Sequence, residues 1–266
     1  MIDLPINEII CEDCLEALPD FPTNSIDMIL SDLPYGVTQN SKDVKLDLVK
    51  LWIEYKRVIK PGGNIVLTSQ FPFTLELINK NYDWFKYDLI WDKDAVSGFL
   101  NSNKQPLRSH EHVLIFYEKF RTYNPQKVPG KKNHGQRIRS QKNSNYGDFN
   151  FVDNKDKLGP WKHPKSILRF PRDPSSNIIH PTQKPVRLFE FLVKSFSNEN
   201  EVVLDTCIGS GTTAVACIMS NRKYIGIDID QKWVDCTNKR ILSTPTPLIK
   251  YMKLDDLSIK TKQLRT

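Results

Sequence analysis

The sequence VVLDTCIGSGTTA, residues 202–214, runs from an apolar, strand-like segment through a glycine turn directly into a helix-like segment. Gly209, Gly211 and Ala214 have the spacing G-x-G-x-x-[G/A], with which a strand–turn–helix unit brings its backbone close to a nucleotide. Asp228 ends the next apolar run, where an acid suits a ribose hydroxyl. The pattern predicts a nucleotide-type site at the carboxyl edge of a parallel sheet.

The charges around this turn favour one kind of ligand. Asp205 ends the apolar run itself, where its carboxylate would face and repel the pyrophosphate of a nicotinamide dinucleotide. S-adenosylmethionine carries a sulfonium, an ammonium and a ribose but no phosphate, so it matches a site lined by Asp205 and Asp228. We therefore expect S-adenosylmethionine as cofactor, with a dinucleotide-dependent dehydrogenase as the alternative from the glycine spacing alone.

Strand-like and helix-like segments alternate along most of the chain, which predicts an α/β fold with a mostly parallel sheet and helices on both faces. The expected strands are 26–31, 63–69, 84–91, 112–117, 201–205 and 223–228. The expected helices are 45–60, 72–80, 186–197, 211–220 and 231–242, the first ending at Pro61-Gly62-Gly63.

Residues 120–176 interrupt this alternation. They are rich in Lys, Asn, Gly and Pro, and they form too long a segment for an ordinary loop. From Phe120 to Arg172 the chain has thirteen Lys and Arg but three acids, a net charge of +10, whereas the whole chain carries +7. Aromatic side chains lie between these basic residues, a combination typical of nucleic-acid binding. A solvated, unused basic surface is the simpler alternative.

Composition restricts the class of protein. The 266 residues are 39% hydrophobic and contain no apolar run of membrane-spanning length, and acids occupy the N-terminal stretch where a signal peptide would be basic. We expect a soluble, cytoplasmic protein with no membrane contact. The five cysteines include one C-x-x-C pair and no second pair, so we expect reduced thiols and no metal. His110 and His112 flank Glu111 as a metal site would, but nothing nearby completes a ligand set.

A second functional stretch, SDLPYG at 31–36, follows the expected strand 26–31. In a parallel sheet its loop would open at the same edge as the glycine turn, which makes a site for two substrates. The exocyclic amine of adenine is a poor nucleophile until its lone pair is localised. Asp32 can accept one amino hydrogen and the carbonyl of Leu33 or Pro34 the other. Tyr35 offers a face for a base turned out of its duplex.

These segments resemble the amino-methylating DNA methyltransferases of the permuted, beta-class arrangement. DLPYG at 32–36 is similar to that family's catalytic D-P-P-Y motif, and DTCIGSGTT at 205–213 is similar to its cofactor loop. HPTQKP at 180–185 resembles the segment before the cofactor half, RSHEHVLIFYEK at 108–119 resembles the stretch before the target-recognition insert, and ICEDCLEAL at 10–18 resembles the opening G-D-C motif.

The resemblance implies a circularly permuted, Rossmann-like class I methyltransferase fold, S-adenosylmethionine as methyl donor and adenine-N6 methylation of double-stranded DNA on a flipped-out base. It assigns catalysis to Asp32, Leu33, Pro34 and Tyr35. It assigns cofactor binding to Asp13, Asp32, His180, Thr182, Lys184, Asp205, Cys207, Gly209, Ser210, Gly211, Thr212 and Asp228, and it implies no metal. His180 as a structural turn residue is the alternative at that position.

The resemblance also divides the chain. It implies a catalytic half at 1–119, a basic target-recognition insert at 120–176, a cofactor-binding half at 177–245 and a basic tail at 246–266. Members of the family are often homodimers, and some work beside a restriction endonuclease, so both partners are open expectations.

Three positions depart from the family pattern. Leu33 replaces the first proline of the catalytic motif, Glu12 replaces the glycine of the opening motif, and Thr206-Cys207 replaces a proline and an aromatic in the cofactor loop. Asp32 favours adenine, while the cytosine-N4 amine, an RNA base and a glutamine side chain remain alternative substrates. A catalytically inactive DNA-binding relative is the alternative outside the enzyme class.

Overall fold

The computed structural model describes residues 3–35, 46–130, 161–174, 178–180 and 182–245. The chain separates into two compact units. One comprises Met1–Asn124 and Ser166–Thr266, and the other comprises Pro125–Lys165. The candidate site lies wholly in the first unit.

An eight-stranded sheet forms the first unit, in the spatial order β1-β10-β9-β2-β3-β5-β4-β8. Its strands are β1 (Glu8–Cys11), β2 (Ile26–Ser31), β3 (Ile59–Ser69), β4 (Phe85–Ser97), β5 (Arg108–Phe116), β8 (Ile167–Arg169), β9 (Val202–Asp205) and β10 (Lys223–Asp228). All neighbours pair in parallel except that β5 is antiparallel to both β3 and β4. A mostly parallel α/β sheet is therefore confirmed.

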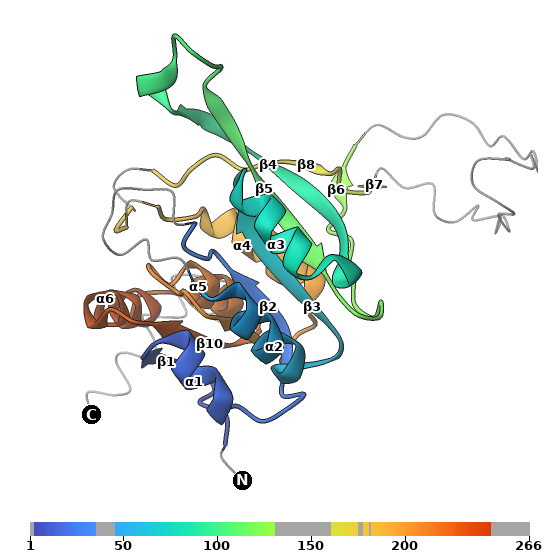
Figure 1. The fold of residues 1–266 in the computed structure, drawn as a ribbon, viewed down its shortest axis with the longest axis vertical. Coiled ribbons are helices and arrows are strands. Elements are labelled where there is room, and N and C mark those ends of the chain that lie inside the picture. Colours follow the sequence, from blue (N-terminus) through green and yellow to red (C-terminus); the bar gives the residue numbers. More distant parts are fainter. Residues whose placement is uncertain (1–2, 36–45, 131–160, 175–177, 181, 246–266) are drawn as a thin grey trace, which may run out of the picture. The chain divides into compact units, whose positions relative to one another are not determined.

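Helices cover both faces of this sheet (Figure 1). The α-helices are α1 (Cys14–Ala17), α2 (Leu48–Val58), α3 (Phe73–Lys80), α4 (Val186–Phe196), α5 (Thr212–Met219) and α6 (Gln231–Leu242), and the 3-10 helices are η1 (Leu18–Asp20), η2 (Tyr82–Trp84) and η3 (Phe99–Asn101). Side chains of α1, α2 and α3 pack into one hydrophobic core, and those of α4 and α5 pack into another.

Alternation along the central strands separates the two cores. In β2, Ile29 faces the α1–α3 side while Met28 and Leu30 face the α4–α5 side. Leu204 and Val203 of β9 divide in the same way. Successive strand residues point to opposite faces, so a strand covered on both faces has to be apolar throughout. This explains why β2 and β9 appear in the sequence as short, continuous hydrophobic runs.

Several predicted elements match the structure in both bounds. The strands 26–31 and 223–228 and the helix 231–242 are found as predicted. Helix α6 begins after Asp230, whose side chain accepts a hydrogen bond from the Lys232 amide and so caps the helix. Apolar runs bounded by turn residues and capping acids are strong local signals, which is why these bounds could be read from the sequence.

Other predictions need correction. Pro61-Gly62-Gly63 does not end the helix 45–60: α2 ends at Val58, and all three residues lie in β3. Gly63 is needed there because a side chain would meet the Asp27 carbonyl and Ile59 at under 3 Å. The sequence predictions name no element over residues 8–17, where the structure has β1 and α1, because four residues give too few repeats for a periodic pattern.

The second unit contains one small sheet among its described residues. Strand β6 (Val128–Pro129) pairs antiparallel with β7 (Trp161–Lys162). Residues 131–160 and 175–177 of the expected basic insert, and all of the expected tail 246–266, lie outside the described residues.

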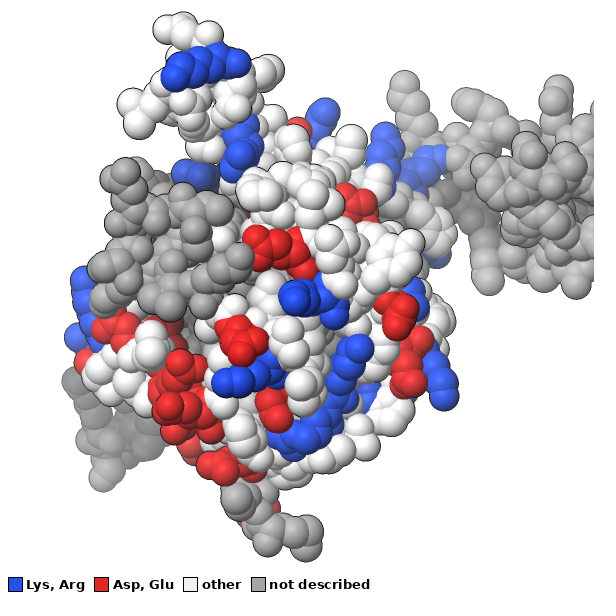
Figure 2. Space-filling model, viewed as in Figure 1, with Lys and Arg blue, Asp and Glu red and all other residues white. Residues whose placement is uncertain are grey.

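Two properties of the surface bear on function. Among the described residues, no helix is both long and apolar enough to cross a membrane. Figure 2 shows acidic and basic side chains mixed over the face that α1, α2 and α3 cover. Among the described residues, this mixture leaves no extended basic area on that face that would attract a polyanion.

Candidate active site

The two loops that the sequence singles out open side by side. Strands β2 and β9 are direct neighbours, with Met28 opposite Val203 and Ile29 opposite Leu204. At their carboxyl ends the Ser31 hydroxyl donates to Asp205 Oδ1 over 2.6 Å, and the Thr206 amide donates to Ser31 Oγ over 3.0 Å. Because these hydrogen bonds join the strand ends, the loops that begin at Asp32 and Thr206 form one site.

Asp32 is held by three donors from three parts of the chain. The Tyr35 hydroxyl donates to Asp32 Oδ1 over 2.9 Å, and the Thr68 hydroxyl of β3 donates to the same oxygen. The Lys184 ammonium donates to Oδ2 over 2.7 Å. The carboxylate is partly exposed, so it is fixed in direction and still open to a ligand.

Lys184 belongs to a buried group of four charges, which we call the charge chain: Asp32, Lys184, Glu111 and Lys93. Lys184 Nζ lies 3.2 Å from Glu111 Oε2, and Lys93 Nζ lies 3.2 Å from Glu111 Oε1. Two cations and two anions balance within the protein, which is what allows such groups to be buried. The charge chain connects the loop of Asp32 to Glu111 in β5 and Lys93 in β4.

Mutual attraction keeps Lys184 and Glu111 ionised, whereas burial lowers the pKa of Lys93 below its ordinary value. Burial acts to lower the pKa of Lys184, but Asp32 and Glu111 together raise that pKa above its ordinary value. Burial acts to raise the pKa of Glu111, but Lys184 and Lys93 lower it below its ordinary value. At neutral pH Asp32 therefore faces a cation.

Tyr35 and Leu33 anchor the loop of Asp32. Burial, followed by the charge of Asp32, raises the pKa of Tyr35 well above its ordinary value, so its hydroxyl stays protonated and donates to Asp32. The Tyr35 ring packs against Phe73, with ring centroids 5.4 Å apart. Leu33 points into the core of the α1–α3 side. Burial of the Leu33 side chain thus holds the turn at the position where the D-P-P-Y motif has its first proline.

The glycine turn takes the conformation that its sequence requires. Gly209 and Gly211 have φ angles of +50° and +78°, which glycine adopts without strain. A Cβ on Gly211 would lie 2.6 Å from Thr237 of α6, whereas a Cβ on Gly209 would have one neighbour within 4 Å among the described residues, the Cys207 carbonyl at 3.9 Å. Asp228 Oδ2 accepts from the Gly209 amide over 2.9 Å. Among the described residues, the space beside Gly209 is therefore open, and the hydrogen bond from the Gly209 amide to Asp228 holds the turn in place.

Asp205 is placed beneath this turn. It is 3% exposed, and it accepts hydrogen bonds from Ser31, from the Thr213 hydroxyl and from the Cys207 amide. Burial raises the pKa of Asp205 to about 6. All of these partners lie inside the protein, so Asp205 organises the cofactor-type loop from within and the partly exposed Asp228 is the acid nearer to solvent.

The remaining predicted cofactor residues surround the same edge. Asp13 caps α1, accepting from the Leu15 amide over 2.8 Å, and the Glu12 amide donates to the Asp228 carbonyl. The His180 ring meets Trp233 of α6 edge-on at a centroid distance of 4.1 Å, and its Nδ1 lies 3.0 Å from the Thr182 hydroxyl. The segment around His180 is thus attached to α6.

Ser210, Thr212 and Cys207 complete the loop. Ser210 and Thr212 are buried, and both contact the Arg240 guanidinium. The Thr212 hydroxyl donates to the Lys184 carbonyl over 3.2 Å, which ties the glycine turn to the charge chain. Contact with the Cys14 thiol, together with burial, raises the pKa of Cys207 well above its ordinary value, so this thiol is protonated at neutral pH.

Sequence reasoning missed five residues that build the site: Ser31, Thr68, Lys93, Glu111 and Thr237. Ser31 and Thr68 are polar residues within apolar runs, a signal that such a side chain has a specific buried partner. Glu111 drew attention only through its neighbours His110 and His112. In the structure His112 contacts Asp88 at 2.9 Å, and within the described part of the chain no three His, Cys, Asp or Glu side chains gather as a metal site.

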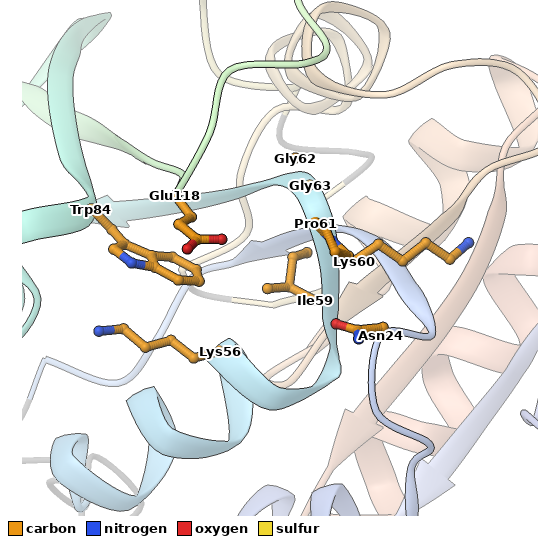
Figure 3. Close-up of a pocket in the computed structure, with 9 residues that line it drawn as sticks. All are labelled: Asn24, Lys56, Ile59, Lys60, Pro61, Gly62, Gly63, Trp84 and Glu118. Atoms are coloured by element: carbon orange, nitrogen blue, oxygen red, sulfur yellow. The ribbon is translucent and has the colours of Figure 1, made fainter.

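A cavity of about 240 Å³ lies at the opposite edge of the sheet, where β2 and β3 begin (Figure 3). Its walls include Gly63, Trp84, Glu118 and Lys56, whose ammonium lies 5.0 Å from the centre of the Trp84 ring. Asp32 and the glycine turn follow the other ends of the strands, so this cavity is separate from the candidate active site.

Comparison with known proteins identifies the family. A model of the DNA methylase family N6_N4_Mtase matches residues 26–239. The chain is 29% identical to the type II methyltransferase M.HpaI of Haemophilus parainfluenzae over 88% of its own length and 73% of that protein. It is 28% identical to the DNA adenine methyltransferase YhdJ of Escherichia coli (strain K12), over 88% of its own length and 82% of that protein.

The fold is also found in a solved structure. The chain resembles M1.HpyAVI in its complex with SAM, with a TM-score of 0.58, 21% identity and coverage of 88% of this chain and 98% of that one. The family match spans the strand before Asp32, the charge chain, the glycine turn and most of α6. The chain therefore belongs to the DNA methylase family.

Proposed function

We propose that this protein transfers the methyl group of S-adenosylmethionine to the exocyclic N6 amine of adenine in DNA. One observation carries the proposal: a fixed, partly exposed carboxylate at Asp32 and an open glycine turn at Gly209 follow adjacent parallel strands and share one edge of the sheet. In such sheets ligands bind at the carboxyl ends of the strands. Two loops there give room for a methyl donor and an acceptor.

Asp32 is suited to orient an amine. A carboxylate accepts about four hydrogen bonds, and Tyr35, Thr68 and Lys184 provide three. The remaining capacity accepts one amino hydrogen, and the carbonyl of Leu33 or Pro34 accepts the other. The amine lone pair is then drawn out of conjugation with the ring. Because Asp32 is fixed before the substrate arrives, this orientation needs no rearrangement.

The cofactor-type loop fits S-adenosylmethionine. Open space above Gly209 lets a ligand approach the backbone, and the Asp228 carboxylate, which accepts hydrogen bonds from the amides of Gly209 and Asp230, keeps capacity for ribose hydroxyls. Asp13, His180 and Thr182 would complete the adenosine side. Asp32, Asp205 and Asp228 make this edge anionic, which suits a cationic donor better than a pyrophosphate. When bound, S-adenosylmethionine supplies an electrophilic methyl group.

Adenine is proposed as the base for two reasons. Asp32 heads a motif that in the amino-methylating family goes mainly with adenine, and the relative YhdJ is named a DNA adenine methyltransferase. The matching family model is named for both N6 and N4 methylation, so the cytosine-N4 amine is the second candidate.

DNA recognition and assembly belong to the same proposal. We assign target recognition to the basic insert at 120–176, between a catalytic half and a cofactor half, and we infer that the base is flipped out of the duplex because Asp32 lies in a partly buried loop. We place the protein in the cytoplasm with its DNA. A second copy of the chain and a restriction endonuclease are further partners, to be tested by light scattering and by co-purification.

The first experiment measures transfer of a labelled methyl group from S-adenosylmethionine to unmethylated DNA, followed by digestion to nucleosides. N6-methyladenine is the expected product, and N4-methylcytosine would correct the base while keeping the mechanism. Asp32→Ala should lower the rate at least about 100-fold while DNA binding is retained. Cofactor binding without any label on DNA would overturn the proposal, and so would an unchanged rate for Asp32→Ala.

A further inference from the structure

The paired strands β4 and β5 extend beyond the rest of the sheet and end in an exposed, partly apolar tip (Figure 1). The last pair is Ser97 opposite Arg108, and the residues between them, 98–107, are called the hairpin tip. Phe99 is 66% exposed and Leu100 is 100% exposed. Large apolar side chains held out in water on a projecting element indicate a contact surface.

The hairpin tip lies on the side of the sheet that carries the candidate active site. Strand β4 runs parallel to β3 and β2, so its carboxyl end shares an edge with Asp32. The charge chain gives a direct connection, since Lys93 in β4 reaches Asp32 through Glu111 and Lys184 by contacts of 3.2, 3.2 and 2.7 Å. From Lys93 to Phe99 an extended chain spans at most about 20 Å. A duplex that delivers a base to Asp32 therefore comes within reach of the tip.

The chemistry of the tip suits DNA. Residues 95–110 contain Lys104 and Arg108 and no acid, and Figure 2 shows basic and uncharged side chains on the visible face of this projection. Lys104 and Arg108 follow the apolar pair in the chain, and they can contact phosphates while the apolar side chains enter the duplex. Proteins that distort DNA use Phe and Leu in this way, as wedges between base steps.

We propose that the hairpin tip is a DNA wedge: Phe99 and Leu100 insert beside the target base and stabilise the duplex from which it has been turned out, while Lys104 and Arg108 contact the phosphates. The proposal rests on the proposed function and deepens it. Turning a base out costs a few kcal/mol of stacking and pairing, least for a base with no partner. The wedge should consequently raise the rate of methyl transfer when the target base is paired, and it should have little effect on that rate when the base is unpaired.

The test compares two double variants with matched losses of exposed apolar surface. Phe99→Ala/Leu100→Ala removes the wedge, and Ile53→Ala/Tyr82→Ala removes exposed side chains from α2 and η2. The site methylated by the wild type is first identified by sequencing. Methyl transfer is then measured on a duplex with the target base paired and on one with the target opposite an abasic position. Leu100→Ala alone is included, because that side chain is fully exposed and its loss leaves no cavity.

We expect the wedge variant to lose about tenfold or more in rate on the paired duplex and less than about threefold opposite the abasic position. The control variant should match the wild type on both. Equal losses on the two substrates, or no loss on either, would overturn the wedge. A concentration-dependent mass of the wild type that the wedge variant lacks would instead make the tip a contact between copies. Absence of DNA methylation by the wild type would overturn the proposed function itself, and the wedge with it.

Discussion

Lys184 contacts two carboxylates inside the protein, Asp32 and Glu111, and is 7% exposed. Sequence reasoning placed this lysine in a cofactor pocket. Its position next to Asp32 gives it a second task, since a cation at that distance holds the carboxylate in one direction. Removing one member of a buried ionic group leaves another charge uncompensated, which costs about 3–5 kcal/mol.

Stability and activity should respond differently to changes in the charge chain. Lys184→Met leaves Asp32 without its cation and Glu111 with Lys93 alone, so we expect a loss of about 3–5 kcal/mol in the free energy of unfolding and a clear loss of methylation. Lys184→Met/Glu111→Gln restores the charge balance and should regain part of the stability, whereas methylation stays low because Asp32 has lost its donor. Urea unfolding and methyl transfer measure the two effects. Recovery of both together would show that Lys184 serves stability alone.

Asp205 predicts a dependence of stability on pH. Burial raises its pKa from 3.8 to about 6 in the folded protein. The folded chain therefore holds this proton more tightly than the unfolded chain, and the free energy of unfolding falls as pH rises from about 4 to about 6, by roughly 3 kcal/mol. Asp205→Asn keeps the shape but does not titrate. The difference in unfolding free energy between wild type and Asp205→Asn should shrink by that amount from pH 4 to pH 7. A difference that stays constant would contradict the assignment.

At the scale of elements, α6 and the glycine turn fit each other closely. The Thr237 hydroxyl donates to the Gly209 carbonyl over 2.7 Å, and its methyl group occupies the space beside Gly211. The Arg240 guanidinium donates to the Ser210 carbonyl over 2.8 Å. The turn is thus shaped from behind by a helix that follows it in the chain, so a change on α6 acts on the cofactor loop.

Two glycines with similar backbone angles provide a matched pair. Gly211 has φ +78°, and an added Cβ there would lie 2.6 Å from Thr237, whereas Gly98 has φ +90° and an added Cβ there would meet no atom of the described residues within 4 Å. In both variants, alanine at a positive φ destabilises the backbone by about 1 kcal/mol. Only Gly211→Ala also displaces Thr237. We expect Gly211→Ala to weaken S-adenosylmethionine binding at least about tenfold, through this displacement, and Gly98→Ala to leave it unchanged. Calorimetry measures the affinity of each variant for S-adenosylmethionine. Equal affinities of the two variants would show that α6 does not shape the turn.

At the scale of the whole molecule, the sequence carried the architecture and the two loops but not the connections between them. Strands such as 26–31 and 223–228 are recognisable because burial on both faces makes them continuously apolar. The pairing of Lys184 with Asp32 joins residues 152 positions apart. Nothing local marks such a partner, since a lysine before Pro185 reads as an ordinary exposed residue. The buried role of Asp205 was hidden for the same reason, because Ser31 comes from the other half of the chain.

Charge distribution over the whole chain leads to a prediction on DNA binding. The net +10 between Phe120 and Arg172 is assigned to phosphate contacts. Lys131→Gln/Lys132→Gln should therefore weaken DNA binding and reduce the slope of log K against log salt concentration by about 1.8, or 0.9 for each lost contact. The same change at Lys50 and Lys80, on α2 and α3, should leave the slope unaltered. Fluorescence anisotropy across a salt series measures both, and equal slopes would remove the insert from the interface.

The central position of β2 has a consequence during synthesis. This strand is made early and pairs with β3 soon afterwards, but its other neighbour, β9, is translated more than 170 residues later. Until the ribosome has released residues 202–205, one side of β2 presents unpaired backbone groups and uncovered apolar side chains. Ser31 and Asp32 likewise lack the partners that fix them. The nascent chain therefore has an open sheet edge during most of its translation, and this edge needs protection from aggregation. The active site is completed only at the end, when the last third of the chain closes the sheet.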